Sequence, residues 1–170
     1  MVVYLRITDR CNLNCGHCYS IKGTNNMSID VLKKAKELYP QAKFIFHGGD
    51  PSVVDIEWFY KALDILKDNP LSMQSNLVDL SESFTDFLIN FKERFGSSIG
   101  TSLDFERIKH KNKILNNVSL LSEMGFEVTA ILTVTTPQIE QYFQLIEEFK
   151  RAGGKWFKLQ IETSINGDKL

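Results

Sequence analysis

The chain alternates short runs typical of β-strands with longer segments typical of amphipathic helices. After the first run, the strand-like segments recur at a spacing of roughly 28 residues, the length of one strand-plus-helix unit. Because such alternation builds a parallel sheet with right-handed crossovers, we predict an α/β fold. The expected strands are Val2–Ile7, Lys43–His47, Leu71–Ser75, Ser98–Leu103, Glu127–Val134 and Lys155–Ile161.

Capping residues and glycines bound the expected helices. Ser28, Asp55 and Ser81 are typical N-cap residues, and a proline or glycine stands near most of the expected helix ends. The five expected helices run from Ser28 to Tyr39, from Asp55 to Asp68, from Ser81 to Gly96, from about Glu106 to Met124, and from Thr136-Pro137 to Gly153-Gly154.

Polar motifs follow the first four expected strands. The cysteines come after the first strand, Gly48-Gly49 after the second and Asn76 after the third, while Asp104 ends the fourth. In parallel α/β sheets, ligands bind at the carboxyl ends of the strands. We therefore expect one ligand site at this edge of the sheet.

Composition restricts the class of protein. A chain of 170 residues with 43% apolar and 24% charged residues has the size and balance of one globular domain. Its net charge of −1 favours neither a nucleic acid nor an anionic membrane as partner. No apolar run approaches the roughly 20 residues that span a bilayer. An odd number of clustered cysteines argues against disulfides and favours a reducing, cytoplasmic location.

All three cysteines, Cys11, Cys15 and Cys18, lie within eight residues in a C-x₃-C-x₂-C pattern. Thiolates are the preferred ligands of iron–sulfur clusters. Three thiolates leave one iron of a four-iron cluster open, as catalytic metal sites do, and that iron can chelate a small molecule and pass it an electron. The alternative is a Cys₃His zinc site with His17 or His47 as the fourth ligand.

Four elements in order resemble the radical S-adenosylmethionine (radical SAM) superfamily, whose signature is C-x₃-C-x-Φ-C. Here Φ is His17. Gly48-Gly49-Asp50-Pro51 is similar to the family's GGEP motif, Gln74-Ser75-Asn76-Leu77 to its QTN element, and Ser102-Leu103-Asp104 to its S-x-D element. The resemblance is closest to the peptide-modifying SPASM/twitch branch, which includes peptide maturases and anaerobic sulfatase maturases. We expect no C-terminal auxiliary-cluster domain, since no cysteine is left for one.

The resemblance implies both cofactors and their ligands. A [4Fe–4S] cluster would be held by Cys11, Cys15 and Cys18, and S-adenosylmethionine would bind its open iron. The two glycines would contact the methionine amino group, His17 and Tyr19 would line the adenine, and Leu159 would pack against it. The implied cofactor contacts are His17, Tyr19, Gly48, Gly49, Asp50, Ser75, Asn76, Ser102, Asp104 and Leu159.

The resemblance also implies a partial (β/α)₆ TIM-like barrel with parallel strands, and residues 1–170 would form a single core domain that ends just after the sixth strand. The implied function is reductive cleavage of S-adenosylmethionine to a 5′-deoxyadenosyl radical, which abstracts hydrogen from a peptide or protein. Implied partners are that substrate, an external electron donor of the flavodoxin or ferredoxin type, and a partner or further domain over the open side of the barrel.

Two alternative functions stay open at this stage. One is an activating enzyme for a glycyl-radical enzyme, and the other is a catalytically silent metal-binding or truncated scaffold module. A basic run from Arg107 to Lys113 could steer an acidic substrate or form a solvated helix face.

Overall fold

A computed structural model describes residues 1–16, 18, 20, 22–134 and 139–161. The strands follow one another in the sheet in the order β1-β2-β3-β4-β5-β6. The strand pairs β1–β2, β2–β3 and β5–β6 are parallel. This is the predicted α/β arrangement of a partial (β/α)₆ fold. The strands are β1 (Val2–Thr8), β2 (Lys43–Gly48), β3 (Leu71–Gln74), β4 (Ser98–Ser102), β5 (Glu127–Val134) and β6 (Trp156–Ile161).

The helices alternate with these strands, and the three predicted N-caps are confirmed. Ser28, Asp55 and Ser81 each accept a hydrogen bond from a backbone amide in the first turn of their helix. The α-helices are α1 (Ile29–Leu38), α2 (Ile56–Ile65), α3 (Glu82–Phe95), α4 (Lys111–Glu123) and α5 (Ile139–Arg151), and the 3₁₀ helices are η1 (Pro51–Val53) and η2 (Phe105–His110).

Two predicted helix boundaries were wrong. The second helix ends at Ile65 rather than Asp68, because Leu66–Asn69 form a turn in which Asn69 donates to the backbone oxygen of Ala42 (2.8 Å). The fourth does not begin near Glu106 as an α-helix. The Arg107 amide donates to the oxygen of Asp104 (3.0 Å), a tighter spacing that makes this segment 3₁₀.

The chain divides into two compact units. Unit 1 comprises Met1–Leu13, Ser20–Ser75 and Leu80–Ser98, and unit 2 comprises Asn14–Tyr19, Asn76–Asp79 and Ile99–Leu170. The sequence prediction of a single domain over residues 1–170 stays a prediction. No helix in the described ranges is long and apolar enough to cross a bilayer.

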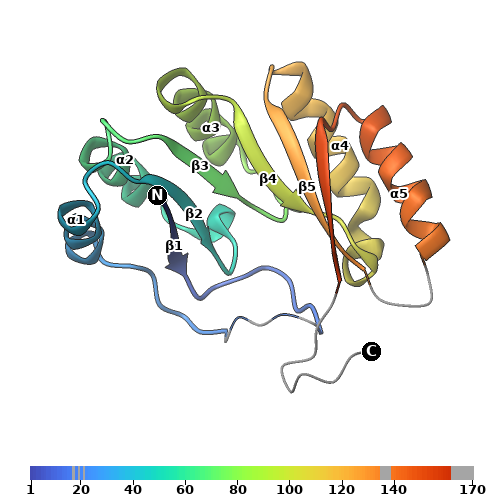
Figure 1. The fold of residues 1–170 in the computed structure, drawn as a ribbon, viewed down its shortest axis with the longest axis horizontal. Helices are drawn as coiled ribbons and strands as arrows, with labels where there is room; N and C mark the ends of the chain where they lie inside the picture. Colours follow the sequence, from blue (N-terminus) through green and yellow to red (C-terminus); the bar gives the residue numbers. More distant parts are fainter. Residues whose placement is uncertain (17, 19, 21, 135–138, 162–170) are drawn as a thin grey trace. The chain divides into compact units, whose positions relative to one another are not determined.

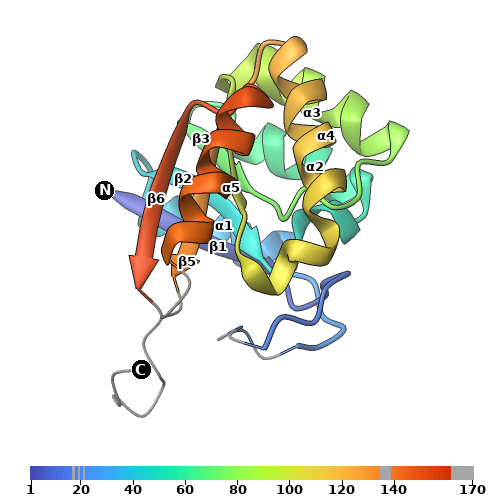
Figure 2. The same cartoon turned by 90° about the vertical axis from the view of Figure 1, so that its right-hand side faces the viewer.

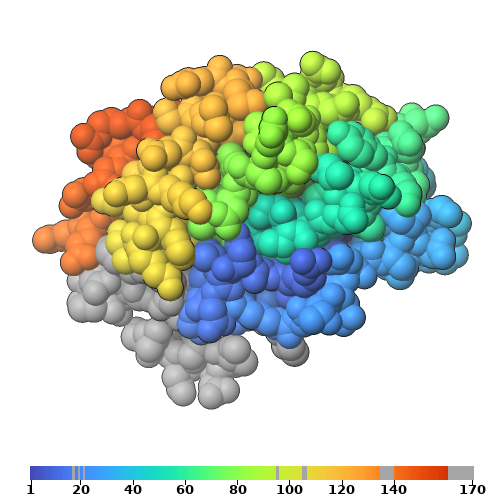
Figure 3. All heavy atoms as spheres, turned by 180° about the vertical axis from the view of Figure 1, so that it is seen from behind, coloured from blue at the N-terminus to red at the C-terminus, as the bar shows by residue number. Residues whose placement is uncertain are grey.

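Aromatic side chains form the core of unit 1. Phe46 of β2 meets Phe59 of α2 edge to face at 5.8 Å between ring centroids, and Phe59 stacks on Phe87 of α3 at 4.5 Å. All three are fully buried. Helices α1, α2 and α3 form the outer layer of this unit, as the ribbon and the rear surface both show (Figure 1 and Figure 3). This core fixes the strand ends of unit 1.

The core of unit 2 combines aliphatic side chains with the buried rings of Phe126, Tyr142 and Phe149. Helices α4 and α5 pack side by side and against β5 (Figure 2). Ile114, Val118 and Leu121 of α4 are fully buried, and so are Val128 and Leu132 of β5. An ion pair of 2.7 Å between Lys111 and Glu148 links the start of α4 to α5. Helix α4 is therefore a fixed support for the loops of this unit that it contacts.

Candidate cofactor site

The loop that carries the cysteines is closed at its base. This cysteine loop, residues 9–25, leaves the end of β1 and returns beside it. The Asp9 amide donates to the oxygen of Asn25 at 2.9 Å, and Thr8 and Asn26 form an antiparallel bridge. The Thr8 hydroxyl also donates to Asn26 Oδ1 at 2.7 Å. These contacts hold both ends of the loop against β1.

Within the loop, the three cysteines are accessible and none is in a disulfide. Cys11 and Cys15 are half-buried, and Cys18 is exposed. The Leu13 amide donates to Cys11 Sγ at 3.4 Å, and the Cys18 amide donates to the oxygen of Cys15 at 3.3 Å. Hydrogen bonds to sulfur stabilise thiolate ligands of iron–sulfur clusters. The donor type and this amide contact therefore fit an iron–sulfur cluster.

Among the described residues, no three His, Cys, Asp or Glu side chains are already grouped to hold a metal ion. His47, one fourth ligand of the zinc alternative, lies on β2 with its ring edge to face with Tyr4 at 6.1 Å. Burial lowers the pKa of His47, and the charge of Arg6 lowers it further. His17, the other, lies outside the described residues.

The Gly48–Asp50 turn binds the segment that enters the cysteine loop. The Gly49 amide donates to the oxygen of Thr8, and the Asp50 amide to the oxygen of Arg10, both at 2.8 Å. A Cβ at Gly49 would lie 1.9 Å from the Arg10 oxygen, and one at Gly48 would lie 2.5 Å from the Thr8 oxygen. Both glycines are thus required by contact with the chain itself. The sequence had suggested a close approach to a ligand.

Asp50 is a buried anchor for this turn. Its carboxylate accepts from the Ser52 amide at 2.9 Å and from the Ser75 hydroxyl at 3.1 Å. Asp50 is 1% exposed and Ser75 is 5% exposed. Unit 1 therefore brings together three predicted site residues, Gly49, Asp50 and Ser75, with the backbone that leads to Cys11.

Asn76 begins a turn in unit 2. Its side-chain oxygen accepts from the Val78 amide at 2.9 Å, and Asn76 is 7% exposed. Leu77, which follows it, is fully buried with a φ of 54°. The side-chain oxygen of Asn76 therefore helps to form this turn.

Asp104 and Ser102 lie at the end of β4. Asp104 is 1% exposed and forms an ion pair with Arg107, whose side chain is 15% exposed. Ser102 is half-buried in the last position of the strand. Asp104 caps η2 without a side-chain cap hydrogen bond, so a capping role does not explain its burial.

Three predicted cofactor contacts remain, Leu159, His17 and Tyr19. Leu159 lies on β6 and is 44% exposed. His17 and Tyr19 fall outside the described residues. The cofactor contacts of this set stay predictions.

The basic run is largely paired within unit 2. Arg107 pairs with Asp104, Lys111 with Glu148, and Lys113 with Asp79. The pairing with Lys111 lowers the pKa of Glu148. These pairs reduce the field that the run can exert on an acidic substrate, and the run is not a simple solvated face.

Sequence reasoning missed several residues that shape these turns. Thr8 holds the base of the cysteine loop, and Asn117 of α4 contacts the turn after β3. Arg107 was predicted only as part of the basic run, and its ion pair with Asp104 was missed. Their types are common in any chain. The position of Thr8, a polar residue at the end of a strand, was a sequence signal for its role. No sequence signal pointed to Asn117.

A family profile and individual relatives point to the same protein family. The sequence profile of the Radical SAM superfamily matches residues 5–149. The chain is 25% identical over 174 residues to the cysteine-type anaerobic sulfatase-maturating enzyme of Clostridium novyi, which covers 84% of this chain and 45% of that protein. It is also 25% identical to the serine-type enzyme of Bacteroides thetaiotaomicron, over 82% of this chain and 41% of that protein.

Solved structures agree on the fold. The anaerobic sulfatase-maturating enzyme anSMEcpe, with bound AdoMet and the Cp18Cys peptide, aligns with a TM-score of 0.77 and 20% identity over 96% of this chain and 51% of that one. SuiB of Streptococcus suis, bound to its precursor peptide SuiA, aligns with a TM-score of 0.77 and 16% identity over 95% of this chain and 39% of that one.

The chain spans about half the length of the curated relatives it matches. The resemblance inferred from the cysteines, the Gly48–Asp50 turn and the two later motifs is confirmed, including its closeness to the sulfatase-maturase branch. Because the profile covers most of its length, the chain belongs to the radical SAM superfamily.

Proposed function

We propose that this chain is the S-adenosylmethionine-cleaving core of a radical SAM enzyme that acts on a peptide or protein. Its superfamily carries the two predicted cofactors, a [4Fe–4S] cluster and S-adenosylmethionine. Cys11, Cys15 and Cys18 are the proposed cluster ligands, because they are the chain's only thiols and share one loop. When bound, the cluster supplies the electron that splits S-adenosylmethionine into methionine and a 5′-deoxyadenosyl radical able to remove hydrogen from a C–H bond.

One observation carries this proposal. The Gly48–Asp50 turn donates two backbone hydrogen bonds of 2.8 Å to residues 8 and 10, directly before Cys11. The buried Asp50 carboxylate in turn accepts from Ser75. Two motifs that the family resemblance assigns to S-adenosylmethionine are thus mechanically connected to the first thiol. Such a connection orients a ligand residue from its surroundings, as supporting contacts do in metal sites.

The proposed cofactor contacts are polar groups at strand ends. Gly48, Gly49 and Asp50 would orient the methionine amino group. The buried polar side chains Ser75, Asn76 and Asp104, with Ser102, would bind the ribose hydroxyls and the methionine carboxylate. Hydrogen bonds from groups that are already fixed in place cost little reorganisation when the ligand arrives. Roles for His17, Tyr19 and Leu159 at the adenine belong to the same proposal.

The substrate class follows from the relatives. The sulfatase-maturating enzymes and SuiB with its precursor peptide support a peptide or protein substrate and the maturase reading over the glycyl-radical alternative. An external one-electron donor of the flavodoxin or ferredoxin type and a further domain or partner complete the proposal. A cytoplasmic location accords with three cysteines outside any disulfide.

The test is anaerobic reconstitution with iron and sulfide, followed by metal analysis and electron paramagnetic resonance with and without S-adenosylmethionine. We expect about four irons with sulfide, a reduced-cluster signal that changes on adding S-adenosylmethionine, and 5′-deoxyadenosine formed under dithionite. Cys15→Ser should lose the cluster. Thr24→Ala, an exposed position in the same loop, should retain it.

Other outcomes separate the alternatives. Zinc without sulfide, or a cluster signal indifferent to S-adenosylmethionine, would contradict the proposal and favour the scaffold module. A loaded cluster that binds S-adenosylmethionine yet forms no 5′-deoxyadenosine in the presence of reductant would reject the cleavage step.

A further inference from the structure

The turn after β3 holds a leucine in an unfavourable backbone conformation. We call residues Asn76–Asp79 the Asn76 turn. Leu77 has a φ of 54°. Among the described residues, it is the only residue other than glycine that has a positive φ. The left-handed region is costly for a bulky residue such as leucine, because it brings Cβ close to the following carbonyl oxygen. Such a conformation persists only where surrounding contacts determine it. The contacts around Leu77 therefore show which residues fix the conformation of this turn.

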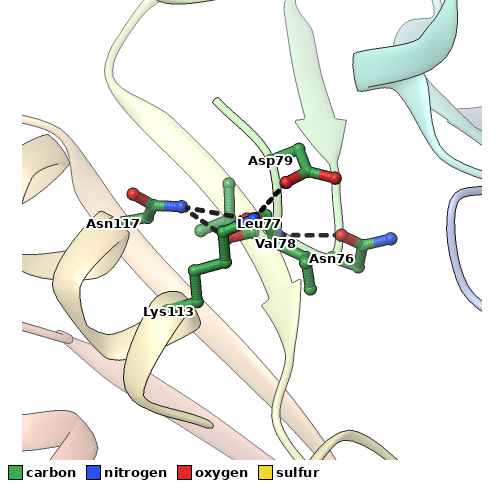
Figure 4. A network of polar contacts seen from close by, with 6 residues as sticks. All are labelled: Asn76, Leu77, Val78, Asp79, Lys113 and Asn117. Carbon is green, nitrogen blue, oxygen red and sulfur yellow. Dashed lines mark hydrogen bonds and ion pairs between the residues drawn. The ribbon is translucent and has the colours of Figure 1, made fainter. Parts of the chain in front are cut away.

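One of these contacts comes from within the turn. Asn76 Oδ1 accepts from the Val78 amide at 2.9 Å, which closes a short ring across Leu77. The same hydrogen bond sets the plane of the Asn76 carboxamide. Its nitrogen points away from Lys113 and Asn117 of α4 (Figure 4). Any change in the Leu77–Val78 peptide would therefore rotate the Asn76 side chain.

Helix α4 supplies further contacts. Asn117 Nδ2 donates to the oxygen of Leu77 at 2.9 Å and approaches the oxygen of Val78 at 3.5 Å (Figure 4). One helical turn earlier, Lys113 Nζ pairs with Asp79 at 2.5 Å. The ion pair is 61% and 54% exposed, so it contributes little. Asn117 is half-buried and contacts the strained peptide itself.

We propose that Asn117 is a positioning residue for S-adenosylmethionine. By binding the Leu77 and Val78 carbonyl groups it keeps Leu77 in its left-handed conformation, and so keeps the Asn76 carboxamide in the orientation that the cofactor meets. This inference rests on the proposed function, in which Asn76 contacts S-adenosylmethionine. Neither the family motifs nor the sequence pattern identifies Asn117.

The first test compares two neighbouring asparagines. Asn117→Asp keeps the shape of the side chain but replaces the amide donor with a carboxylate that repels the two carbonyl oxygens. Asn116→Asp adds the same charge at an exposed position one residue earlier on α4. In reconstituted protein, equilibrium dialysis should give an S-adenosylmethionine Kd raised about tenfold for Asn117→Asp. Asn116→Asp should bind as wild type does, and both should keep full iron and sulfide content.

The second test needs no cofactor. Hydrogen exchange of the protein without S-adenosylmethionine should be about tenfold faster in the Asn76 turn of Asn117→Asp, and unchanged in Asn116→Asp. Asn117→Ala, which removes the donor without adding charge, provides the same readout if Asn117→Asp folds poorly. Unchanged exchange in a folded Asn117 variant would overturn the inference.

The outcomes distinguish this inference from the proposed function. A lower melting temperature with unchanged S-adenosylmethionine affinity would assign Asn117 a structural role only and overturn its positioning role. If wild type and Asn116→Asp also fail to bind S-adenosylmethionine, the proposed function itself fails, and the role of Asn117 fails with it.

Discussion

The Gly48–Asp50 turn and the Asn76 turn each follow a strand, yet different contacts hold them. In the first, backbone amides of Gly49 and Asp50 bind backbone oxygens of Thr8 and Arg10. In the second, the side chain of Asn117, 40 residues later than Leu77, binds the backbone oxygen of the turn. The first turn requires glycines, which have no side chain. The second requires the side chain of Asn117, which is distant in the sequence.

This difference decides how much each turn shows in the sequence. Contact between two backbones leaves no space for a Cβ, so it demands glycine and produces a motif. Contact from a helix side chain requires only a single asparagine at one position of the helix. A single asparagine is too common a residue to form a recognisable motif. Four predictions test this contrast, from the largest expected effect to the smallest.

Gly49→Ala should have the largest effect. The new Cβ would lie 1.9 Å from the Arg10 oxygen and 2.5 Å from the Arg10 carbonyl carbon. Both are backbone atoms, so no side-chain rotation can relieve the overlap, and we expect a loss of about 3 kcal/mol in the free energy of unfolding. Urea unfolding of the protein without cofactor measures this loss. Iron content after reconstitution should fall in parallel.

Gly96→Ala is the matched control. Its Cβ would meet nothing within 4 Å, but its φ is +103°. We expect a loss of about 1 kcal/mol from backbone strain and normal iron content. If Gly49→Ala is no worse than Gly96→Ala, the backbone contact does not hold the cysteine loop.

Asp50→Ala should have the next largest effect, about 2 kcal/mol in the free energy of unfolding. The Ser52 amide and the buried Ser75 hydroxyl would both lose the carboxylate as an acceptor. Asp55→Ala removes a comparable cap, which accepts from the Glu57 amide at 2.9 Å, but at an exposed position. Water can replace the Asp55 carboxylate, so about 1 kcal/mol is expected there. Equal losses in the two variants would mean that burial of Asp50 adds nothing.

His47 lies directly before the Gly48–Asp50 turn and makes stability in this region depend on pH. Its pKa is lowered from 6.5 by burial, then by Arg6. The unfolded chain therefore binds the proton more readily, so the free energy of unfolding should fall as pH drops through 6.5. Urea unfolding across this range measures the slope, and His47→Gln should flatten it. An equally steep slope in His47→Gln would assign the dependence to other groups.

Lys113→Ala should have the smallest effect. The pair with Asp79 is exposed on both sides, so we expect a change below about 0.5 kcal/mol that decreases with added salt. Lys109→Ala, also exposed, is the control. The result to compare is hydrogen exchange of the Asn76 turn, which should respond to Asn117 variants and not to Lys113→Ala. Faster exchange in Lys113→Ala would make the ion pair, rather than Asn117, the main support of the turn.

The fold was largely predictable from local signals. Ser28, Asp55 and Ser81 cap their helices as expected, and β5 has the predicted bounds. These features depend on periodicity and on contacts within a few residues. The misplaced start of the fourth helix has a different cause. The ion pair of the buried Asp104 with the half-buried Arg107, and the 3₁₀ turn around it, depend on what surrounds the end of β4, which local propensity does not report.

The sequence by itself determined the α/β order, the three thiols in one loop and the glycines of the Gly48–Asp50 turn, because periodicity, thiolate chemistry and a missing Cβ are properties of the residues themselves. Only the tertiary structure decided that those glycines pack on Thr8 and Arg10, that Asp50 anchors Ser75, and that Asn117 supports Leu77. The physical reason is range. A hydrogen bond between residues 25 or 40 positions apart forms only when packing brings them together, and no local pattern records that packing.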